Sequence, residues 1–182
     1  MRFRLALLLS LLLASFSLVA ANIPRPAQNL KFRTPVGEIA LSQYRGKIVV
    51  LEFLLTTCPA CKNCSRVMEK LNKEFAAKGV QMLGVAINEG ADRLIQQYVN
   101  EVGSTYPVGY VDARTALDFL QHPVMLRMSV PQLVFIDRNG MVRAQYPGTD
   151  AFFNDEEKNM RQMLQGLLKG TPSQKPSTVK KR

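Results

Sequence analysis

An apolar run that leads directly into two closely spaced cysteines constrains the fold of this chain more than any other feature. Residues 48–55 are apolar except for Glu52, and Cys58 and Cys61 follow with only two residues between them. Continuous apolar runs of this length are typical of strands that helices cover on both faces. Pro59 suits the first position of a helix, where its missing N–H would have no partner. The sequence therefore predicts a buried strand and then a helix that has Cys58 at its N-terminus.

The two thiols at this junction have the spacing that thiol–disulfide exchange requires. The positive end of the helix dipole favours the thiolate form of Cys58, which is the form that attacks a disulfide. We expect the nearby cation of Lys62 to add to this effect. Cys61 lies one turn further along and can displace a product that Cys58 has captured. The alternative interpretation is a purely structural disulfide at the same spacing.

The lone acid in the apolar run is a second candidate for chemistry. An unpaired carboxylate is costly to bury in its ionised form. We therefore expect burial to raise the pKa of Glu52 toward neutrality, which suits a group that moves protons. The alternative is an edge strand from which the Glu52 side chain reaches water.

The rest of the chain alternates between strand patterns and helix patterns. Strands in alternation with helices imply parallel pairing, and the turn at 138–140 joins two strands into an antiparallel hairpin at the sheet edge. The predicted fold class is α/β, in three layers, with helices on both faces of a mixed central sheet and an N-terminal β-hairpin. The expected strands are 30–33, 38–41, 48–55, 80–87, 106–111, 132–137 and 141–146; the expected helical segments are 42–46, 59–78, 91–102, 115–120 and 155–168, the last capped by Asn154; residues 22–29 form an extended lead-in.

The N-terminus has the features of an export signal. Two arginines precede an almost wholly apolar stretch, residues 5–19, and two alanines follow it as the small residues that signal peptidase recognises. We expect residues 1–21 to be a signal peptide and residues 22–170 to form one domain with a full hydrophobic core. The protein would then be exported and work in the periplasm. An uncleaved membrane anchor through residues 5–21 is the alternative.

The positive charge of the chain is unevenly placed. The formal net charge is +10, but two arginines lie in the expected signal and four basic residues lie in residues 171–182, which leaves about +4 on the domain. We expect this basic tail, rich in Pro, Ser and Lys, to be disordered. Contact of the tail with anionic lipid is the alternative. An exported chain without a basic–aromatic array is not expected to bind nucleic acid.

Three segments together resemble the thioredoxin superfamily, and within it the exported TlpA/ResA-like thiol–disulfide oxidoreductases of the redoxin, or AhpC/TSA-related, branch. The first is the acid-containing strand that leads to Cys58-Pro59-Ala60-Cys61. The second is Ser129-Val130-Pro131 with the strand after it, which is similar to the cis-proline loop of the family. The third is the leading hairpin with Ser42-Gln43-Tyr44-Arg45-Gly46-Lys47.

The resemblance implies roles for individual residues. Cys58 would be the nucleophile, Cys61 the resolving thiol, and Glu52 a buried acid that moves protons for Cys61. The peptide bond before Pro131 would be cis, and the backbone of Val130 would form hydrogen bonds with the substrate. The surface that contacts the substrate would also include Thr57, Pro59 and Ala60.

The resemblance also implies a function, namely disulfide reduction on protein substrates, with apocytochrome c as one example. The Cys58–Cys61 pair would cycle between dithiol and disulfide, so no metal and no cofactor other than this redox-active pair is expected. An upstream electron-donor protein would regenerate the dithiol.

Two departures from the family pattern leave alternatives open. Thr57 stands where the family usually has Trp, and the chain contains no Trp. Cys64 is an additional cysteine, for which a packed apolar side chain is the plain interpretation and a second resolving thiol is an alternative. One alternative function is a peroxiredoxin-like thiol peroxidase, although the Pro-x-x-x-Thr-x-x-Cys pattern is missing before Cys58. The other is a copper-binding or metallochaperone module with ligands from Cys58, Cys61, Cys64 or His122.

Overall fold

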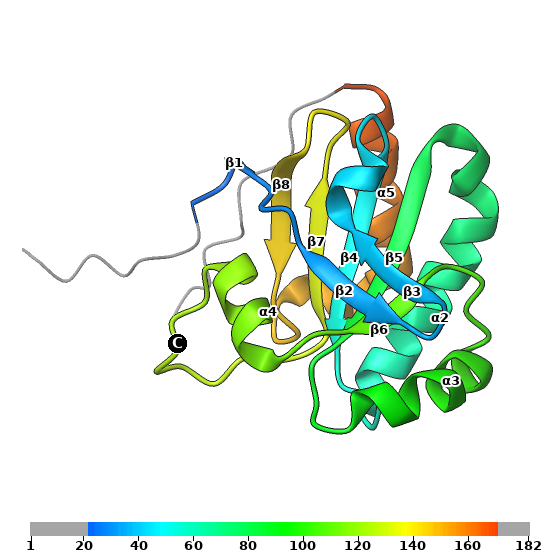
Figure 1. Ribbon diagram of the computed structural model, residues 1–182. Coiled ribbons are helices and arrows are strands. Elements are labelled where there is room, and N and C mark those ends of the chain that lie inside the picture. Colours follow the sequence, from blue (N-terminus) through cyan, green and yellow to red (C-terminus); the bar gives the residue numbers. More distant parts are fainter. Residues whose placement is uncertain (1–21, 171–182) are drawn as a thin grey trace, which may run out of the picture.

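The computed structural model describes residues 22–170, which build one eight-stranded mixed sheet (Figure 1). The strands lie in the order β1-β8-β7-β4-β5-β6-β2-β3. β4 pairs in parallel with β5, and β5 with β6, whereas the other neighbours are antiparallel. The bounds are β1 Arg25–Pro26, β2 Lys31–Thr34, β3 Gly37–Ala40, β4 Ile48–Leu54, β5 Val80–Ala86, β6 Val108–Tyr110, β7 Gln132–Ile136 and β8 Met141–Tyr146.

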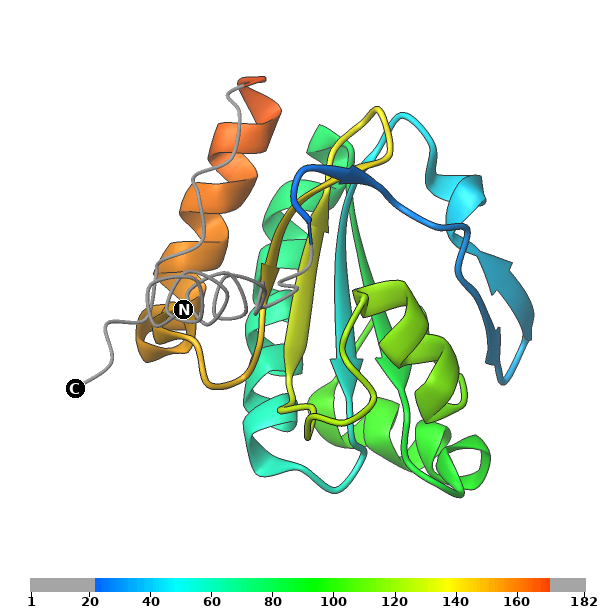
Figure 2. The same cartoon turned by 90° about the vertical axis from the view of Figure 1, so that its left-hand side faces the viewer.

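The helices divide between the two faces of the sheet. α2 (Pro59–Phe75), α3 (Ala91–Val102) and α5 (Glu156–Leu168) bury their apolar residues in one core cluster with one face of β4. α4 (Ala113–Leu120) packs on the opposite face, together with the N-terminal hairpin of β2 and β3. Figure 2 shows the sheet nearly edge-on, with α2 and α5 on one side and α4 on the other. Three short 3-10 helices complete the described chain: η1 Leu41–Tyr44, η2 Ala76–Lys78 and η3 Ala151–Asp155.

β4 is the centre of the molecule, and all seven of its residues are buried. Its side chains alternate between the two core clusters: Val50 and Leu54 belong to the cluster under α2, and Leu51 and Phe53 to the cluster under α4. Because this alternation has a period of two, Glu52 faces α2. Each large apolar side chain that is fully buried stabilises the fold by about 1.5–3 kcal/mol, so the packing on both sides of β4 fixes the position of Glu52.

The predicted α/β class, the mixed sheet, the N-terminal hairpin and the helices on both faces are confirmed. The edge of the sheet differs from the prediction, because β1 pairs with β8 and the hairpin of β7 and β8 is therefore internal. A two-residue strand has no alternation that would reveal it in the sequence. The start of the last helix also differs: Asp155, not Asn154, precedes its first residue, because η3 occupies the expected cap.

The expected signal peptide, residues 1–21, and the expected tail, residues 171–182, lie outside the described residues. Within residues 22–170, no helix has the length and apolar character needed to cross a membrane.

Candidate active site

The junction of β4 and α2 places Cys58 at the start of a helix, as the sequence predicts. Cys58 is the N-cap of α2 and has extended backbone angles, with Pro59 as the first helical residue. The backbone N–H of Cys61 donates a hydrogen bond of 3.4 Å to Cys58 Sγ. A helix N-terminus presents such unpaired N–H groups, and they stabilise a thiolate. The local geometry therefore places the Cys58 sulfur where a backbone N–H of the first helical turn donates to it.

The turn before Cys58 is held from a neighbouring loop. The backbone N–H of Thr56 donates to Asn88 Oδ1 at 2.9 Å, and Asn88 Nδ2 donates to Thr56 Oγ1 at 3.1 Å. The backbone N–H of Cys58 donates to the Leu55 carbonyl oxygen at 3.1 Å. Sequence reasoning missed Asn88, because the contact spans 32 residues and only the parallel pairing of β4 with β5 brings the two loops together. Asn88 thus fixes the approach to the first thiol.

The two thiols of the motif differ in their access to solvent. Cys58 is partly exposed, whereas Cys61 is fully buried. Burial raises the pKa of the Cys61 thiol well above its ordinary value, and the nearby charge of Glu52 raises it further. Thr57, Pro59 and Ala60 around Cys58 are all exposed. An incoming disulfide can therefore reach Cys58 directly and Cys61 only through Cys58.

Glu52 lies on the face of β4 that α2 covers, and it has no exposed surface. The hydroxyl of Ser65 donates a hydrogen bond of 2.7 Å to Glu52 Oε2, and Ser65 Oγ also lies 2.8 Å from the Tyr98 hydroxyl. Desolvation raises the pKa of Glu52 to about 8, against the opposing hydrogen bond from Ser65. The alternative of an edge strand with Glu52 in water is wrong, since β4 lies between β5 and β7.

The loop before β7 reaches the same end of the sheet as Cys58. β7 runs antiparallel to β4 with Phe53 opposite Gln132, so Pro131 lies level with the end of β4. The peptide bond between Val130 and Pro131 is cis, as the resemblance implies. The start of α2 and this loop both lie at the lower end of the sheet in Figures 1 and 2.

Gly148 makes this loop possible through a close backbone approach. A Cβ atom at residue 148 would lie 2.5 Å from the carbonyl oxygen of Val130 and 2.7 Å from its carbonyl carbon. Both are backbone atoms, which cannot rotate away. Only glycine therefore lets the chain after β8 pass so close to the cis peptide bond. Sequence reasoning did not single out Gly148, because nothing local marks it.

We predict that Gly148→Ala displaces the Val130–Pro131 backbone. The expected cost is about 1–3 kcal/mol in the free energy of unfolding, with at least about a tenfold loss of activity on a protein disulfide if this backbone pairs with the substrate. Urea unfolding and the rate of reduction of a protein disulfide would measure the two effects. Gly166→Ala is the matched control: a Cβ there has no neighbour within 4 Å, and in a helix it should stabilise by about 0.5–1 kcal/mol. Wild-type activity in Gly148→Ala would contradict the prediction.

The structure also places three further residues that the sequence analysis considered, Lys62, Cys64 and His122. Lys62 forms an ion pair of 2.8 Å with Glu101 on α3, so the expectation that it aids Cys58 receives no support. Cys64 is fully buried in the core, in line with a packed side chain. His122 Nδ1 lies 3.0 Å from the Pro123 carbonyl oxygen. Among residues 22–170, no group of three or more His, Cys, Asp or Glu side chains is arranged to hold a metal ion.

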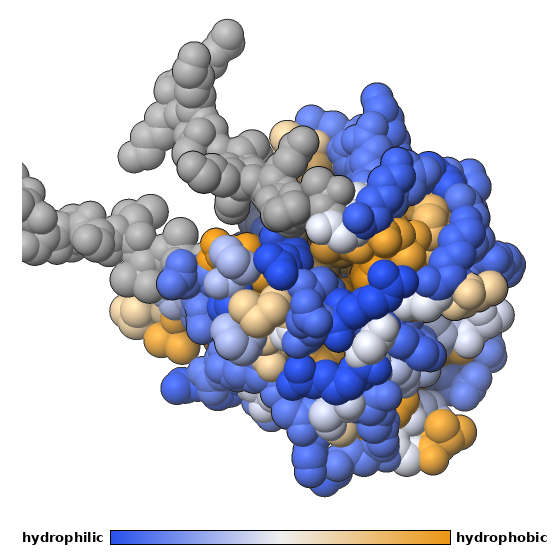
Figure 3. All heavy atoms as spheres, turned by 90° about the horizontal axis from the view of Figure 1, so that it is seen from above, coloured by the Kyte–Doolittle hydropathy of each residue, from blue (hydrophilic) through white to orange (hydrophobic). Residues whose placement is uncertain are grey.

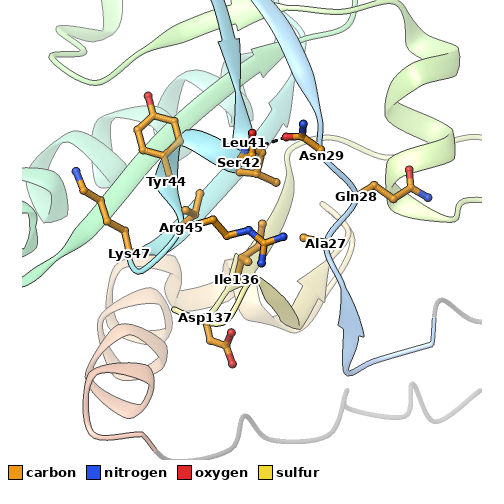
Figure 4. A pocket seen from close by; sticks show the side chains of 12 residues that line it. Ala27, Gln28, Asn29, Leu41, Ser42, Tyr44, Arg45, Lys47, Ile136 and Asp137 are labelled. Atoms are coloured by element: carbon orange, nitrogen blue, oxygen red, sulfur yellow. Dashed lines mark hydrogen bonds between the residues drawn. The ribbon is translucent and has the colours of Figure 1, made fainter.

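A shallow pocket lies at the opposite end of the sheet. It is lined where β4 begins and β7 ends, for example by Arg45, Lys47 and Ile136 (Figure 4). Arg45 Nη1 donates to the Asn139 carbonyl oxygen at 3.1 Å, and Ser42 N–H donates to Asn29 Oδ1 at 2.9 Å. Viewed from above, this end of the molecule is mostly hydrophilic around a small apolar hollow (Figure 3). None of the predicted site residues lines this pocket.

Comparison with curated proteins finds relatives among thiol–disulfide oxidoreductases. The chain is 32% identical over 116 residues to the thiol–disulfide oxidoreductase ResA of Geobacillus kaustophilus. The matched segment covers 62% of this chain and 61% of the relative. It is 30% identical over 104 residues to ResA of Oceanobacillus iheyensis, and this matched segment covers 57% of this chain and 51% of the relative. The chain thus spans about half to three fifths of the length of these relatives.

Comparison with solved structures finds the same fold. A thioredoxin-family thiol:disulfide interchange protein from Chlorobium tepidum superimposes with a TM-score of 0.64 at 24% identity, covering 80% of this chain and 99% of that one. A thiol:disulfide interchange protein from Bacteroides gives a TM-score of 0.62 at 19% identity, covering 77% and 91%. These likenesses establish the thioredoxin-like fold. The AhpC/TSA family matches residues 23–145, more than half of the chain, so this protein is a member of the AhpC/TSA family with a thioredoxin-like fold.

Proposed function

We propose that this protein is a thiol–disulfide oxidoreductase that uses the pair Cys58 and Cys61. One observation carries the proposal: Cys58 is partly exposed at the N-terminus of α2 and accepts a hydrogen bond from the Cys61 N–H, while the Cys61 thiol is fully buried. Such an arrangement separates a thiol that attacks from a thiol that resolves. The similarity to the ResA oxidoreductases supports it.

The reaction would proceed in two exchanges. The thiolate of Cys58 attacks one sulfur of a substrate disulfide, forms a mixed disulfide, and releases the other substrate sulfur as a thiolate. Cys61 then loses its proton and attacks Cys58 Sγ, which forms the Cys58–Cys61 disulfide and releases the second substrate thiolate. The substrate gains two electrons and, after protonation, two thiols. A dithiol donor protein must return the two electrons for the next cycle.

Glu52 would accept the proton that Cys61 loses. Its carboxyl group is buried near Cys61, since the charge of Glu52 raises the pKa of Cys61. With a pKa of about 8, Glu52 can both take and give a proton near neutral pH. Cys61 could otherwise release its proton only into an apolar core, which is unfavourable.

The substrate would bind across the exposed surface around Cys58. Thr57, Pro59 and Ala60 are exposed beside the first thiol, and the backbone of Val130, before the cis bond to Pro131, would pair with the backbone of the substrate. This surface has no Trp, so a flat aromatic cover over the thiol is absent. We infer extended protein segments that carry a disulfide as substrates, with the disulfide of apocytochrome c as one class. The apolar start of the sequence supports export to the periplasm.

Redox titration tests the proposal. The protein is equilibrated with glutathione buffers, and differential alkylation then identifies which cysteines are linked. We expect a Cys58–Cys61 disulfide, with a potential of about −270 mV for a reductant of protein disulfides; a value of about −120 mV would indicate an oxidant. Peroxide consumption that needs Cys58 but not Cys61 would replace the proposal with a thiol peroxidase. Cu(I) retained by the wild type and lost in Cys64→Ser would instead favour the copper-binding alternative.

A further inference from the structure

A chain of buried hydroxyl groups ends on Glu52. Ser65 Oγ lies 2.7 Å from Glu52 Oε2 and 2.8 Å from the Tyr98 hydroxyl. Ser65 is fully buried and Tyr98 is 1% exposed, so water does not compete for these contacts. Ser65 has a single hydroxyl hydrogen. When it donates that hydrogen to an ionised Glu52, its oxygen must accept from Tyr98, which fixes the order of donors from α3 to α2 to β4.

The second oxygen of Glu52 has different surroundings. Glu52 Oε1 is buried and has no hydrogen-bond partner among the described residues. When Glu52 is ionised, Oε2 accepts the hydrogen of the Ser65 hydroxyl. The carboxylate can then take up a proton at Oε1 while Oε2 stays bound to Ser65.

We propose that Ser65 and Tyr98 are positioning residues that hold Glu52 by Oε2 and leave Oε1 free to exchange a proton with Cys61, an inference that rests on the function proposed above. In the resolving step, the Cys61 S–H bond breaks and its proton moves to Oε1. The electron pair stays on Cys61 sulfur, which then attacks Cys58. Tyr98 acts only through Ser65, because the structure gives it no direct hydrogen bond to Glu52.

Other ionisable groups also face the Glu52 carboxyl group. The Cys64 thiol lies close enough to lower the pKa of Glu52, and half-buried Glu156 raises it. Tyr106 donates from its hydroxyl to the Ser65 backbone oxygen at 3.2 Å and so holds the helix backbone at this position. The groups that surround Glu52 are Cys61, Cys64 and Ser65 from α2, Tyr98 from α3, Tyr106 before β6 and Glu156 from α5.

The test compares pH profiles of Ser65→Ala, Tyr98→Phe and the double variant, each with Glu52 intact and in the Glu52→Gln background. One readout is the rate at which oxidised glutathione oxidises the reduced protein between pH 5 and 10. The other is the pH dependence of unfolding by urea, which reports the titration of Glu52 without any redox reaction. Tyr110→Phe is the control, since no hydrogen bond links this tyrosine to Glu52, Ser65 or Tyr98.

Loss of the Ser65 donor should raise the pH at which Glu52 is half ionised, its pH midpoint, by about one pH unit. This is the size expected for a hydrogen bond to a charged group. The oxidation rate at pH 7 should fall up to about tenfold. Tyr98→Phe, which keeps the buried ring, should shift the midpoint in the same direction by less. The double variant should match Ser65→Ala, because Tyr98 acts through Ser65.

The proposal is overturned if both single variants keep the wild-type pH midpoint of Glu52. It is also overturned if they slow the oxidation by the same factor in the Glu52→Gln background as with Glu52 intact. A shift in Tyr110→Phe of the same size would also overturn it. The second readout separates this inference from the proposed function. If the reduced protein ignores glutathione disulfide but unfolding still shows the shifted midpoints, the hydroxyl chain holds Glu52 and the oxidoreductase assignment is what fails.

Discussion

Cys61→Ser should convert this protein into a trap that stays covalently bound to its substrate. Cys58 keeps its partly exposed position at the N-terminus of α2 and can still attack a disulfide. Without the Cys61 thiol, the step that displaces the captured sulfur from Cys58 is lost. The mixed disulfide should accumulate at one equivalent per protein, which non-reducing gel electrophoresis and intact mass spectrometry would detect.

Cys58→Ser should form no mixed disulfide with the substrate, and it serves as the comparison for Cys61→Ser. It should lower the rate of disulfide reduction by about 10³-fold or more, because no accessible nucleophile remains. Cys64→Ser should keep activity within about twofold, since Cys64 lies outside the proposed Cys58–Cys61 pair and packs in the core. Equal loss of activity in Cys58→Ser and Cys64→Ser, or no trapped complex in Cys61→Ser, would refute the assigned order of the two thiols.

The protein should lose stability as the pH rises from about 5 to 8, because of Glu52. The folded state holds the Glu52 proton up to a pKa of about 8, whereas an unfolded glutamate releases it near 4.5. Between these values the folded state binds one more proton than the unfolded state, so the free energy of unfolding falls by up to about 1.4 kcal/mol per pH unit. Above pH 8 this slope ends. Asp112 and Asp137, whose pKa values are lowered, affect stability only in acid.

Glu52→Gln isolates this contribution. The amide does not ionise, so the variant should have a flatter profile and exceed the wild type by on the order of 3 kcal/mol at pH 8. Urea unfolding at pH 5, 6, 7, 8 and 9 would measure both proteins. Glu101→Gln removes a partly exposed carboxylate that pairs with Lys62 and should follow the wild-type slope. Parallel profiles for Glu52→Gln and wild type would show that Glu52 does not titrate in this range.

The sequence predicted the parts of the site that are contiguous in the chain. The continuous apolar run of β4 specified a strand covered on both faces, and Pro59 specified where α2 begins, so Cys58 was placed correctly. The burial of Glu52 followed from its place within the apolar run, and its raised pKa followed from the cost of burying an ionised carboxylate. The expected help of Lys62 at the first thiol stays a prediction, and the structure shows Lys62 paired with an acid on another helix, Glu101.

Residues from distant segments could not be predicted in the same way. Asn88, Ser65, Tyr98 and Gly148 reach the site only because strand pairing and helix packing bring their segments to it. Their sequence surroundings carry no pattern, since a serine in a helix or a glycine after a strand has many ordinary uses. The cis bond before Pro131 likewise followed from the resemblance rather than from local propensity.

By itself, the order of residues determined the α/β class, the strand–helix junction and the places of the two thiols that we propose to react, because hydrophobic periodicity and helix-capping preferences act over a few neighbouring positions. Tertiary structure decided which oxygen of Glu52 is held and which is free, what fixes the turn before Cys58, and which glycine admits the cis-proline loop. These outcomes depend on contacts between segments that lie 13 to 33 residues apart, or further, in the chain, and no short-range preference encodes them.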